Sequence, residues 1–411
     1  MPTVNRSHRK AEPELFYCRG GIRSGAIDLD VEIFLRASLC IITPAGFGIG
    51  NPLRIFLKDG GRAESGLRSW KAAESGKNQP MFTVFRWLLT GIRTLCLILL
   101  LAWGSLAIYY NLPWESMRVA MALVFLTVGI WALWYSPTWR AITIFAALFL
   151  GVLVWFSSIK PSHDRPWRPE VAVMPRAFID GDRVRITGVR NFEYRSRDDF
   201  TVRYEEREVS LSHLNSLDFY VSYFWPDAVV AHTFVSFVFD NAPPISISIE
   251  TRPEIGEGFD PIPSLFKQFE LIYVVGDERD LVRVRTNYRK EDVFLYHVRT
   301  SPELVRRLFL VYLERINELA DRPEFYHLLS NSCTINIVRY ANLAGRVGRL
   351  DIRHILNGWS DRYLYRAGLL DSRLPFEELR RRSHIDEVAQ AAGDVKDFSE
   401  RIRKSLPTQP R

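Results

Sequence analysis

Three uncharged hydrophobic runs stand close together in the first half of the chain. Residues 94–114, 119–139 and 141–159 contain no Asp, Glu, Lys or Arg. A helix needs about 20 predominantly apolar residues to cross the hydrocarbon core of a bilayer, and each run has about that length. The less favoured alternative is that all three runs are helices buried in a soluble core. Three such runs so close together in the sequence are hard to bury in one core. The pattern therefore predicts three transmembrane helices.

Beyond residue 180 the pattern changes to an alternation of apolar and polar positions. Such alternation is typical of strands with one buried face. The predicted strands cover residues 182–195, 200–211, 229–239, 245–252, 281–289 and 292–299. The turn sequence "DNAPP" separates the third and fourth strands, so these two are predicted to form a hairpin.

Helical periodicity follows the strands. Residues 301–320 place Leu304 and Leu308 on one face, with Ser301 as N-cap and Pro302 at the first helical position. A second helix is predicted to begin at the cysteine of "SNSC", residues 330–333. Strands first and helices afterwards predict an α+β domain.

These patterns divide the chain into five parts. A disordered leader, or one added by a wrongly assigned start codon, is expected before Met81. The expected parts are this leader over 1–80, a three-helix membrane anchor over 81–159, a proline-rich linker over 160–179, the domain over 180–383 and a charged tail over 384–411. For the tail, a surface helix or disorder is favoured.

Arginines orient the predicted spans. Arg86 and Arg93 precede the first span and Arg140 separates the second from the third. The positive-inside rule therefore puts the front of the chain in the cytoplasm and everything after residue 159 outside. With that topology, the net charge of +7 fits anionic lipid headgroups better than nucleic acid.

Cys333 stands alone in the predicted external domain, since the other cysteines are Cys18, Cys40 and Cys96. An unpaired cysteine in an oxidising compartment indicates a reactive thiol or an intermolecular bridge. The alternative is a small buried hydrophobic residue. The preceding "SNS" supplies N-cap residues, so Cys333 falls in the first helical turn, where the helix dipole lowers a thiol pKa. Its backbone N–H can also hold an oxyanion, with Asn331 and Thr334 as supporting side chains.

A thiol nucleophile needs a base, and His232 is the first choice because it lies in an otherwise apolar strand. The alternative is a core histidine bonded to a backbone carbonyl. His327, six residues before the cysteine, is the second choice. A hairpin turn at 241–244 places His232 opposite the region from Glu250 onward, so Glu250 is expected to orient the imidazole.

The segments "AHTFVSFVF", "ISISIETR", "GEGF", "FKQFELIYVVGDERDLVRVRTNYR", "VFLYHVR" and "FYHLLSNSCTINI" resemble the Lnb N-terminal periplasmic domain family over about residues 180–345. That family is named for an enzyme that moves an acyl chain within bacterial lipoproteins. The resemblance implies a permuted papain-like domain at the bacterial inner membrane, facing the periplasm. By position it implies His232 as base and Cys333 as nucleophile, in an order also found in lecithin retinol acyltransferase-like proteins. The three preceding spans depart from the family pattern.

The remaining motifs predict no cofactor and no metal site. The predicted external domain has no second cysteine and no His-x3-His spacing that could bind a metal. It also has no glycine-rich phosphate loop. The charged stretch Asp277–Asp280 offers a metal or headgroup site as one interpretation. A solvated turn with mutual salt bridges is favoured instead.

Three functions follow from these patterns. The leading hypothesis is a membrane-anchored cysteine acyltransferase that acts on lipid or lipoprotein esters through a thioester. The second is a cysteine peptidase or amidase on envelope peptides, and the third is a non-catalytic envelope protein. The expected partners are membrane lipids or lipoproteins, with no nucleic acid, and the oligomeric state is left open.

Overall fold

The computed structural model describes residues 79–226, 228–346, 348 and 351–407. The predicted leader lies outside these residues, apart from its last two positions. The chain divides into two units, Met1–Leu97 and Ile98–Arg411, and the boundary falls within the first described helix.

The three predicted spans are confirmed as helices that are long and apolar enough to cross a membrane. They are α3 (Gln79–Asn111), α4 (Glu115–Ile130), which continues as the π-helix η1 (Trp131–Tyr135), and α5 (Trp139–Ser158). Within the second unit, the helices approach closely at glycines. A Cβ on Gly129 would lie 2.2 Å from the Leu101 side chain, and one on Gly104 would lie 2.6 Å from Phe125. Small residues at such contacts are typical of transmembrane helix packing.

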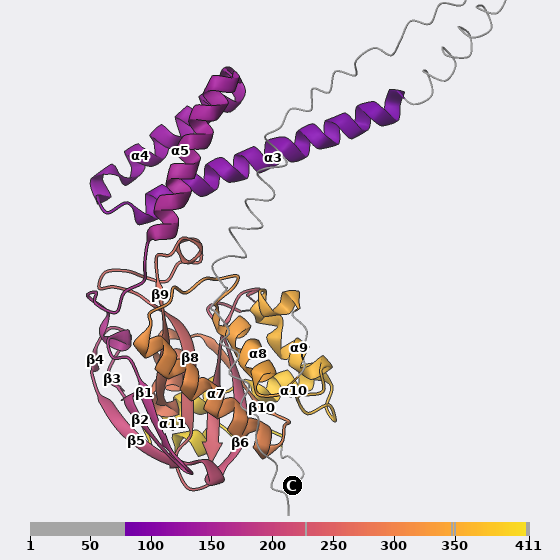
Figure 1. Cartoon of the computed structure of the whole chain (residues 1–411). Helices are drawn as coiled ribbons and strands as arrows, with labels where there is room; N and C mark the ends of the chain where they lie inside the picture. Colours follow the sequence, from indigo (N-terminus) through magenta and orange to yellow (C-terminus); the bar gives the residue numbers. More distant parts are fainter. Residues whose placement is uncertain (1–78, 227, 347, 349–350, 408–411) are drawn as a thin grey trace, which may run out of the picture. The chain divides into compact units, whose positions relative to one another are not determined.

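The domain is built on one large mixed sheet (Figure 1). Its strand order is β1-β2-β9-β8-β7-β6-β10. The remaining strand, β5, pairs with β2 outside this order. The strands are β1 (Arg176–Asp180), β2 (Arg183–Arg190), β5 (Tyr204–Ser210), β6 (Leu214–Tyr223), β7 (His232–Phe239), β8 (Ile245–Arg252), β9 (Glu270–Asp277) and β10 (Asp292–Val298). A separate two-stranded sheet joins β3 (Glu193–Tyr194) and β4 (Phe200–Thr201). The predicted α+β class is confirmed.

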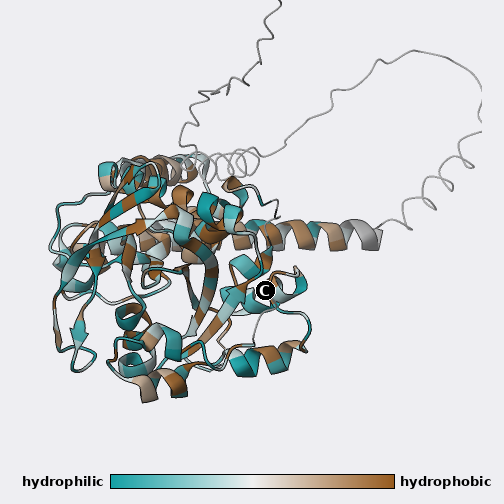
Figure 2. Ribbon diagram, turned by 90° about the horizontal axis from the view of Figure 1, so that it is seen from below, coloured by the Kyte–Doolittle hydropathy of each residue, from teal (hydrophilic) through white to brown (hydrophobic). Residues whose placement is uncertain are grey.

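Helices cover both faces of the large sheet, because its central strands are buried on both sides. Val235 and Phe237 of β7 pack in the same core as α7 (Pro302–Asp321) and α8 (Cys333–Leu343), while Phe234 packs in a second core on the other face. Figure 2 shows hydrophobic segments, in brown, along the strands inside the domain.

Shorter helices complete the domain. They are α6 (Glu278–Arg283), α9 (Ser360–Arg366), α10 (Phe376–Ser383), α11 (Asp386–Ala392), α12 (Phe398–Arg401), the π-helix η5 (Val284–Arg289) and the 3-10 helices η2 (Pro169–Val171), η3 (Leu211–His213), η4 (Pro263–Leu265), η6 (Ile352–His354) and η7 (Asn357–Trp359).

The predicted strand over 281–289 is wrong, because α6 and η5 occupy this segment. Asp277 caps α6 by accepting a hydrogen bond from the backbone N–H of Arg279. The favoured solvated turn over 277–280 is also wrong. Asp280 is fully buried and pairs with the buried Arg190 at 2.9 Å, while Glu278 is fully buried beside Arg403 at 2.6 Å. The charges hold elements of the domain together instead of facing water.

The C-terminal segment, for which a surface helix or disorder was favoured, packs into the domain in its described part. Ile385, Ala389, Phe398 and Ile402 are buried in the core that contains Phe234 of β7. This segment therefore covers the face of the sheet opposite α7 and α8.

Candidate active site around Cys333

Cys333 is the first residue of α8, as predicted, with Ser332 at the N-cap. Its side chain is buried. The next residue fixes the helix against the sheet, since the hydroxyls of Thr334 and Thr233 lie 2.8 Å apart. Thr233 follows His232 in β7, so this contact brings the start of α8 to the start of that strand.

The pKa of Cys333 is lowered to about 6 by its surroundings. Burial acts in the opposite direction, since it disfavours the thiolate. The hydrogen bond with His232 and the charge of that imidazole outweigh burial, and the backbone and side chain of Thr233 add further hydrogen bonds. A thiolate beside an imidazole is the form that acts as a nucleophile.

The hairpin of β7 and β8 places the acidic partner of His232. Phe234 pairs with Ser248 and Phe237 with Ile245 in antiparallel register, and the same register continued by two residues puts His232 opposite Glu250. The His232 Nε2 atom lies 2.6 Å from the Ser248 hydroxyl and 3.8 Å from a Glu250 carboxylate oxygen. Ser248 is therefore the nearer partner of the ring, a contact that the sequence did not single out as functional.

Glu250 is held as a carboxylate by basic neighbours. Burial alone would raise its pKa, but Arg285 first, and then His232, lower the pKa well below its usual range. Arg285 donates to Glu250 at 2.7 Å and comes from η5, the segment that was predicted as a strand. A fixed negative charge beside His232 stabilises the imidazolium that forms during proton transfer.

Asn357 is a site residue that the sequence did not reveal. Its side-chain amide donates to the Cys333 sulfur at 3.6 Å and to the Thr334 hydroxyl at 3.0 Å. Its carbonyl oxygen accepts a hydrogen bond from the backbone N–H of Ala231, directly before His232. One buried amide thus connects both halves of the site.

Gly358 allows η7 to approach that closely. Its N–H donates to the Val229 carbonyl at 2.9 Å, and a Cβ at this position would lie 2.1 Å from the Ala228 carbonyl oxygen. A larger residue would push η7, and Asn357 with it, away from Cys333.

Tyr326 is a second unpredicted neighbour. Burial, and after it the charge of Cys333, raise the pKa of Tyr326 well above its usual value. A hydrogen bond that its hydroxyl accepts from the backbone N–H of Cys333 acts in the opposite direction. A protonated phenol therefore lies beside the N–H that was expected to hold an oxyanion.

Two predicted residues belong to the loop before α8. Asn331 donates its side-chain amide to the Phe325 carbonyl at 2.9 Å and accepts a bond from Asn336. The ring of His327 lies 2.9 Å from the Ser330 hydroxyl. These contacts give both residues a part in shaping the turn that leads into Cys333, and Asn331 directs its amide at the loop instead of the sulfur.

A cavity of about 80 Å³ lies beside Thr334. Its walls are almost entirely apolar and include Val235, Val305, Leu308, Val338 and Ala341, from β7, α7 and α8. It therefore offers space for hydrocarbon one residue along α8 from Cys333.

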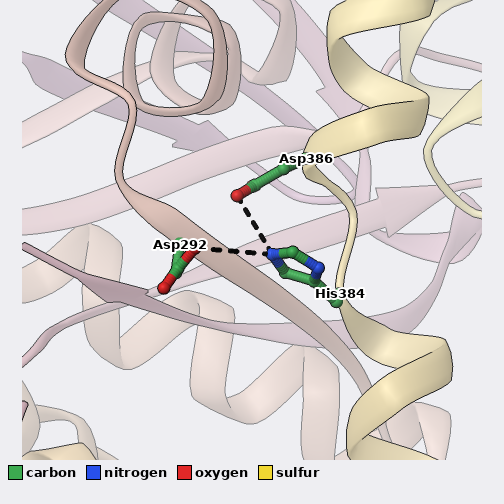
Figure 3. A group of neighbouring side chains, drawn as sticks. All are labelled: Asp292, His384 and Asp386. Atoms are coloured by element: carbon green, nitrogen blue, oxygen red, sulfur yellow. Dashed lines mark hydrogen bonds and ion pairs between the residues drawn. The ribbon is translucent and has the colours of Figure 1, made fainter. Parts of the chain in front are cut away.

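A separate group of possible metal ligands lies on other elements. His384 stands between Asp292 of β10 and Asp386 of α11, with Nε2 at 3.7 Å and 3.0 Å from their carboxylates (Figure 3). Its hydrogen bond with Asp386 is the main cause of a raised pKa for His384. These contacts join β10 to the C-terminal segment.

The fold and the site together define a membrane-anchored α+β protein with a buried cysteine and a histidine side by side. Residues 200–358 match the family model described as the Lnb N-terminal periplasmic domain. The resemblance found in the sequence is thereby confirmed. Comparison with curated proteins and with solved structures gives no significant match. The chain is a membrane-anchored protein with a periplasmic domain.

Proposed function

We propose that the protein is a cysteine acyltransferase of the bacterial inner membrane, acting on lipid or lipoprotein esters. The observation that carries the proposal is the pairing of Cys333, at the start of α8, with His232, at the start of β7. This pairing lowers the thiol pKa to about 6, so the nucleophile is ionised at neutral pH.

In the first half-reaction, the Cys333 thiolate attacks the ester carbonyl carbon and a tetrahedral oxyanion forms. The carbon–oxygen ester bond then breaks, and the imidazolium of His232 gives its proton to the leaving alcohol oxygen. The acyl group remains on the sulfur as a thioester. Ser248 and Glu250 hold the ring in position for both proton transfers.

In the second half-reaction, an amine or water attacks the thioester carbonyl. His232 takes the proton of the attacking group, the carbon–sulfur bond breaks, and the thiolate returns with the imidazolium beside it. The Asn357 amide and the phenol of Tyr326, which flank Cys333, supply donors for the oxyanion in both steps.

The apolar walls of the cavity beside Thr334 support an acyl group over a peptide as the occupant of that cavity. Peptide N–H and C=O groups need hydrogen-bond partners when they are buried, and the walls of the cavity offer few. Hydrocarbon needs none. Anchoring in the membrane also suits a substrate that does not leave the bilayer.

The test is turnover by the full chain in lipid nanodiscs. Phospholipid with a labelled acyl chain is supplied with a lipopeptide that bears a free N-terminal amine, and peptide amides are offered in parallel. We expect the label to appear on the amine or as free fatty acid, and to stay on the phospholipid with Cys333→Ala. Cleavage of peptide amides without release of acyl label would favour the peptidase hypothesis.

A further inference from the structure

Exposed hydrophobic side chains gather on two loops at one end of the sheet. Phe224, Trp225 and Val229 lie between β6 and β7 with exposed fractions of 41%, 63% and 44%. Phe259 and Ile262 lie between β8 and β9 with 45% and 52%. The stacked rings of Phe224 and Phe259, 6.1 Å apart, join the two loops into one surface. We call these five residues the apolar rim.

The rim lies at the same end of the sheet as the candidate active site. The loop of Phe259 and Ile262 runs into Glu270, where β9 begins. Across the sheet, Glu250 pairs with Ile272, near that beginning, and His232 lies opposite Glu250. The loop of Trp225 runs directly into His232. Both loops of the rim therefore border the end of the sheet that holds His232.

The loop between β8 and β9 also contacts the ends of the membrane helices. The Asn111 side chain, at the end of α3, donates to the Phe266 carbonyl at 2.8 Å. Lys267 donates to the carbonyl of Phe156 at 2.8 Å and to that of Ile159 at 3.2 Å, at the end of α5. Phe266 is itself buried in the core formed by the spans. The loop thus begins in the rim and ends at the outer ends of the spans.

We propose that the apolar rim rests in the outer surface of the lipid bilayer that anchors the chain. A cluster of exposed large hydrophobic side chains marks an interaction surface, and aromatic residues are enriched at the membrane–water interface. Because the loop of Phe259 and Ile262 is tied to the ends of α3 and α5, the bilayer is the apolar partner within its reach. The rim then brings the His232 end of the sheet to the level of lipid esters.

The depth of the rim can be measured without any assumption about catalysis. The full chain, with Cys18, Cys40, Cys96 and Cys333 changed to Ser, receives Phe259→Cys or Trp225→Cys and an environment-sensitive fluorophore at that site. It is placed in nanodiscs of phosphatidylethanolamine and phosphatidylglycerol that contain lipid spin-labelled near the top of its acyl chain. Val202→Cys is the matched control, because the Val202 side chain is 51% exposed and stands two residues before Tyr204. Tyr204 pairs with Arg190, which in turn pairs with Gly276 at the far end of β9.

We expect the spin label to quench both rim fluorophores several times more strongly than the fluorophore at position 202. Quenching at either rim site that does not exceed the control would overturn the proposal. Far-UV circular dichroism and monodisperse elution of each labelled chain establish that it is folded before the comparison. An inactive enzyme would leave this measurement unaffected, so failure of the proposed function and failure of the docking surface are separate outcomes.

Discussion

The side-chain amide of Asn357 donates to the Cys333 sulfur at 3.6 Å, while the carbonyl of the same side chain accepts from the residue before His232. Asn357 thereby holds the nucleophile and the start of the base-bearing strand in one hydrogen-bond network. Asn357 belongs to η7, more than twenty residues after the first turn of α8 in the sequence. Because it contacts both halves of the site, it is a positioning residue.

Asn357→Asp should raise the pKa of Cys333. The carboxylate keeps the acceptor for Ala231 but replaces the donor beside the sulfur with a negative charge, and a like charge disfavours the thiolate. The midpoint of the pH dependence of alkylation should move above that of the wild type. Asn357→Ala, which removes the donor without adding a charge, should give a smaller upward shift. An unchanged midpoint in the Asp variant would exclude contact between this amide and the thiolate.

In the wild type, alkylation of Cys333 should reach its maximal rate below the pH expected for a free thiol. The folded pKa is about 6, whereas an unperturbed cysteine has about 8.5. Because the thiolate reacts, the rate should rise with pH through about 6 and be level well before pH 8. Stopped-flow alkylation of the chain with Cys18, Cys40 and Cys96 changed to Ser measures this profile. A midpoint at the free value would indicate a structural cysteine.

Substitutions of His232 and of its two partners, Ser248 and Glu250, should lower acyl transfer to different extents. His232→Ala removes the base and should lower turnover about 10²- to 10⁴-fold. Ser248→Ala removes a contact that holds the ring, and Glu250→Gln removes the charge that stabilises the imidazolium, so each variant should fall between His232→Ala and the wild type. His327→Ala should keep most of the activity, since its ring contacts Ser330 in the loop. An inactive His327→Ala beside an active His232→Ala would reverse the assignment of the base.

Gly358→Ala should disrupt the site through the backbone. Its Cβ would lie 2.1 Å from the Ala228 carbonyl oxygen, so η7 must move, and such overpacking costs about 1–3 kcal/mol of stability. Thermal unfolding and alkylation of Cys333 should both change. Gly258→Ala is the control, because nothing lies within 4 Å of a Cβ there and both properties should stay as in the wild type. Equal behaviour of the two variants would contradict the close packing of η7.

Local patterns predicted the parts of the site that depend on neighbouring residues. The residues before Cys333 favour a helix start, so its place in the first turn of α8 follows from the sequence. The hairpin register follows from a short turn and from strict alternation, which put Glu250 opposite His232. These features are set within a few residues or within one hairpin.

The rest of the site depends on contacts between distant segments. Asn357 lies in a 3-10 helix without periodicity, and its position is set by hydrogen bonds to Val229 and Ala231. Arg285 was assigned to a strand because its segment alternates in polarity. The helical conformation of this segment follows from the Asp277 cap and from the buried ion pairs that Asp280 makes with Arg190 and Glu278 makes with Arg403. No local pattern reveals these pairs.

The mass of the intact protein after exposure to lipid tests the central claim, an acyl thioester on Cys333, most directly. The full chain is incubated in phospholipid nanodiscs without an amine acceptor, quenched in acid at short times, and analysed with and without neutral hydroxylamine, which cleaves thioesters. We predict an added mass equal to one acyl group, located on the peptide that contains Cys333, removed by hydroxylamine and absent from Cys333→Ala. Acyl transfer by the wild type with no adduct on Cys333 at any time, or an equal adduct on Cys333→Ala, would contradict the account.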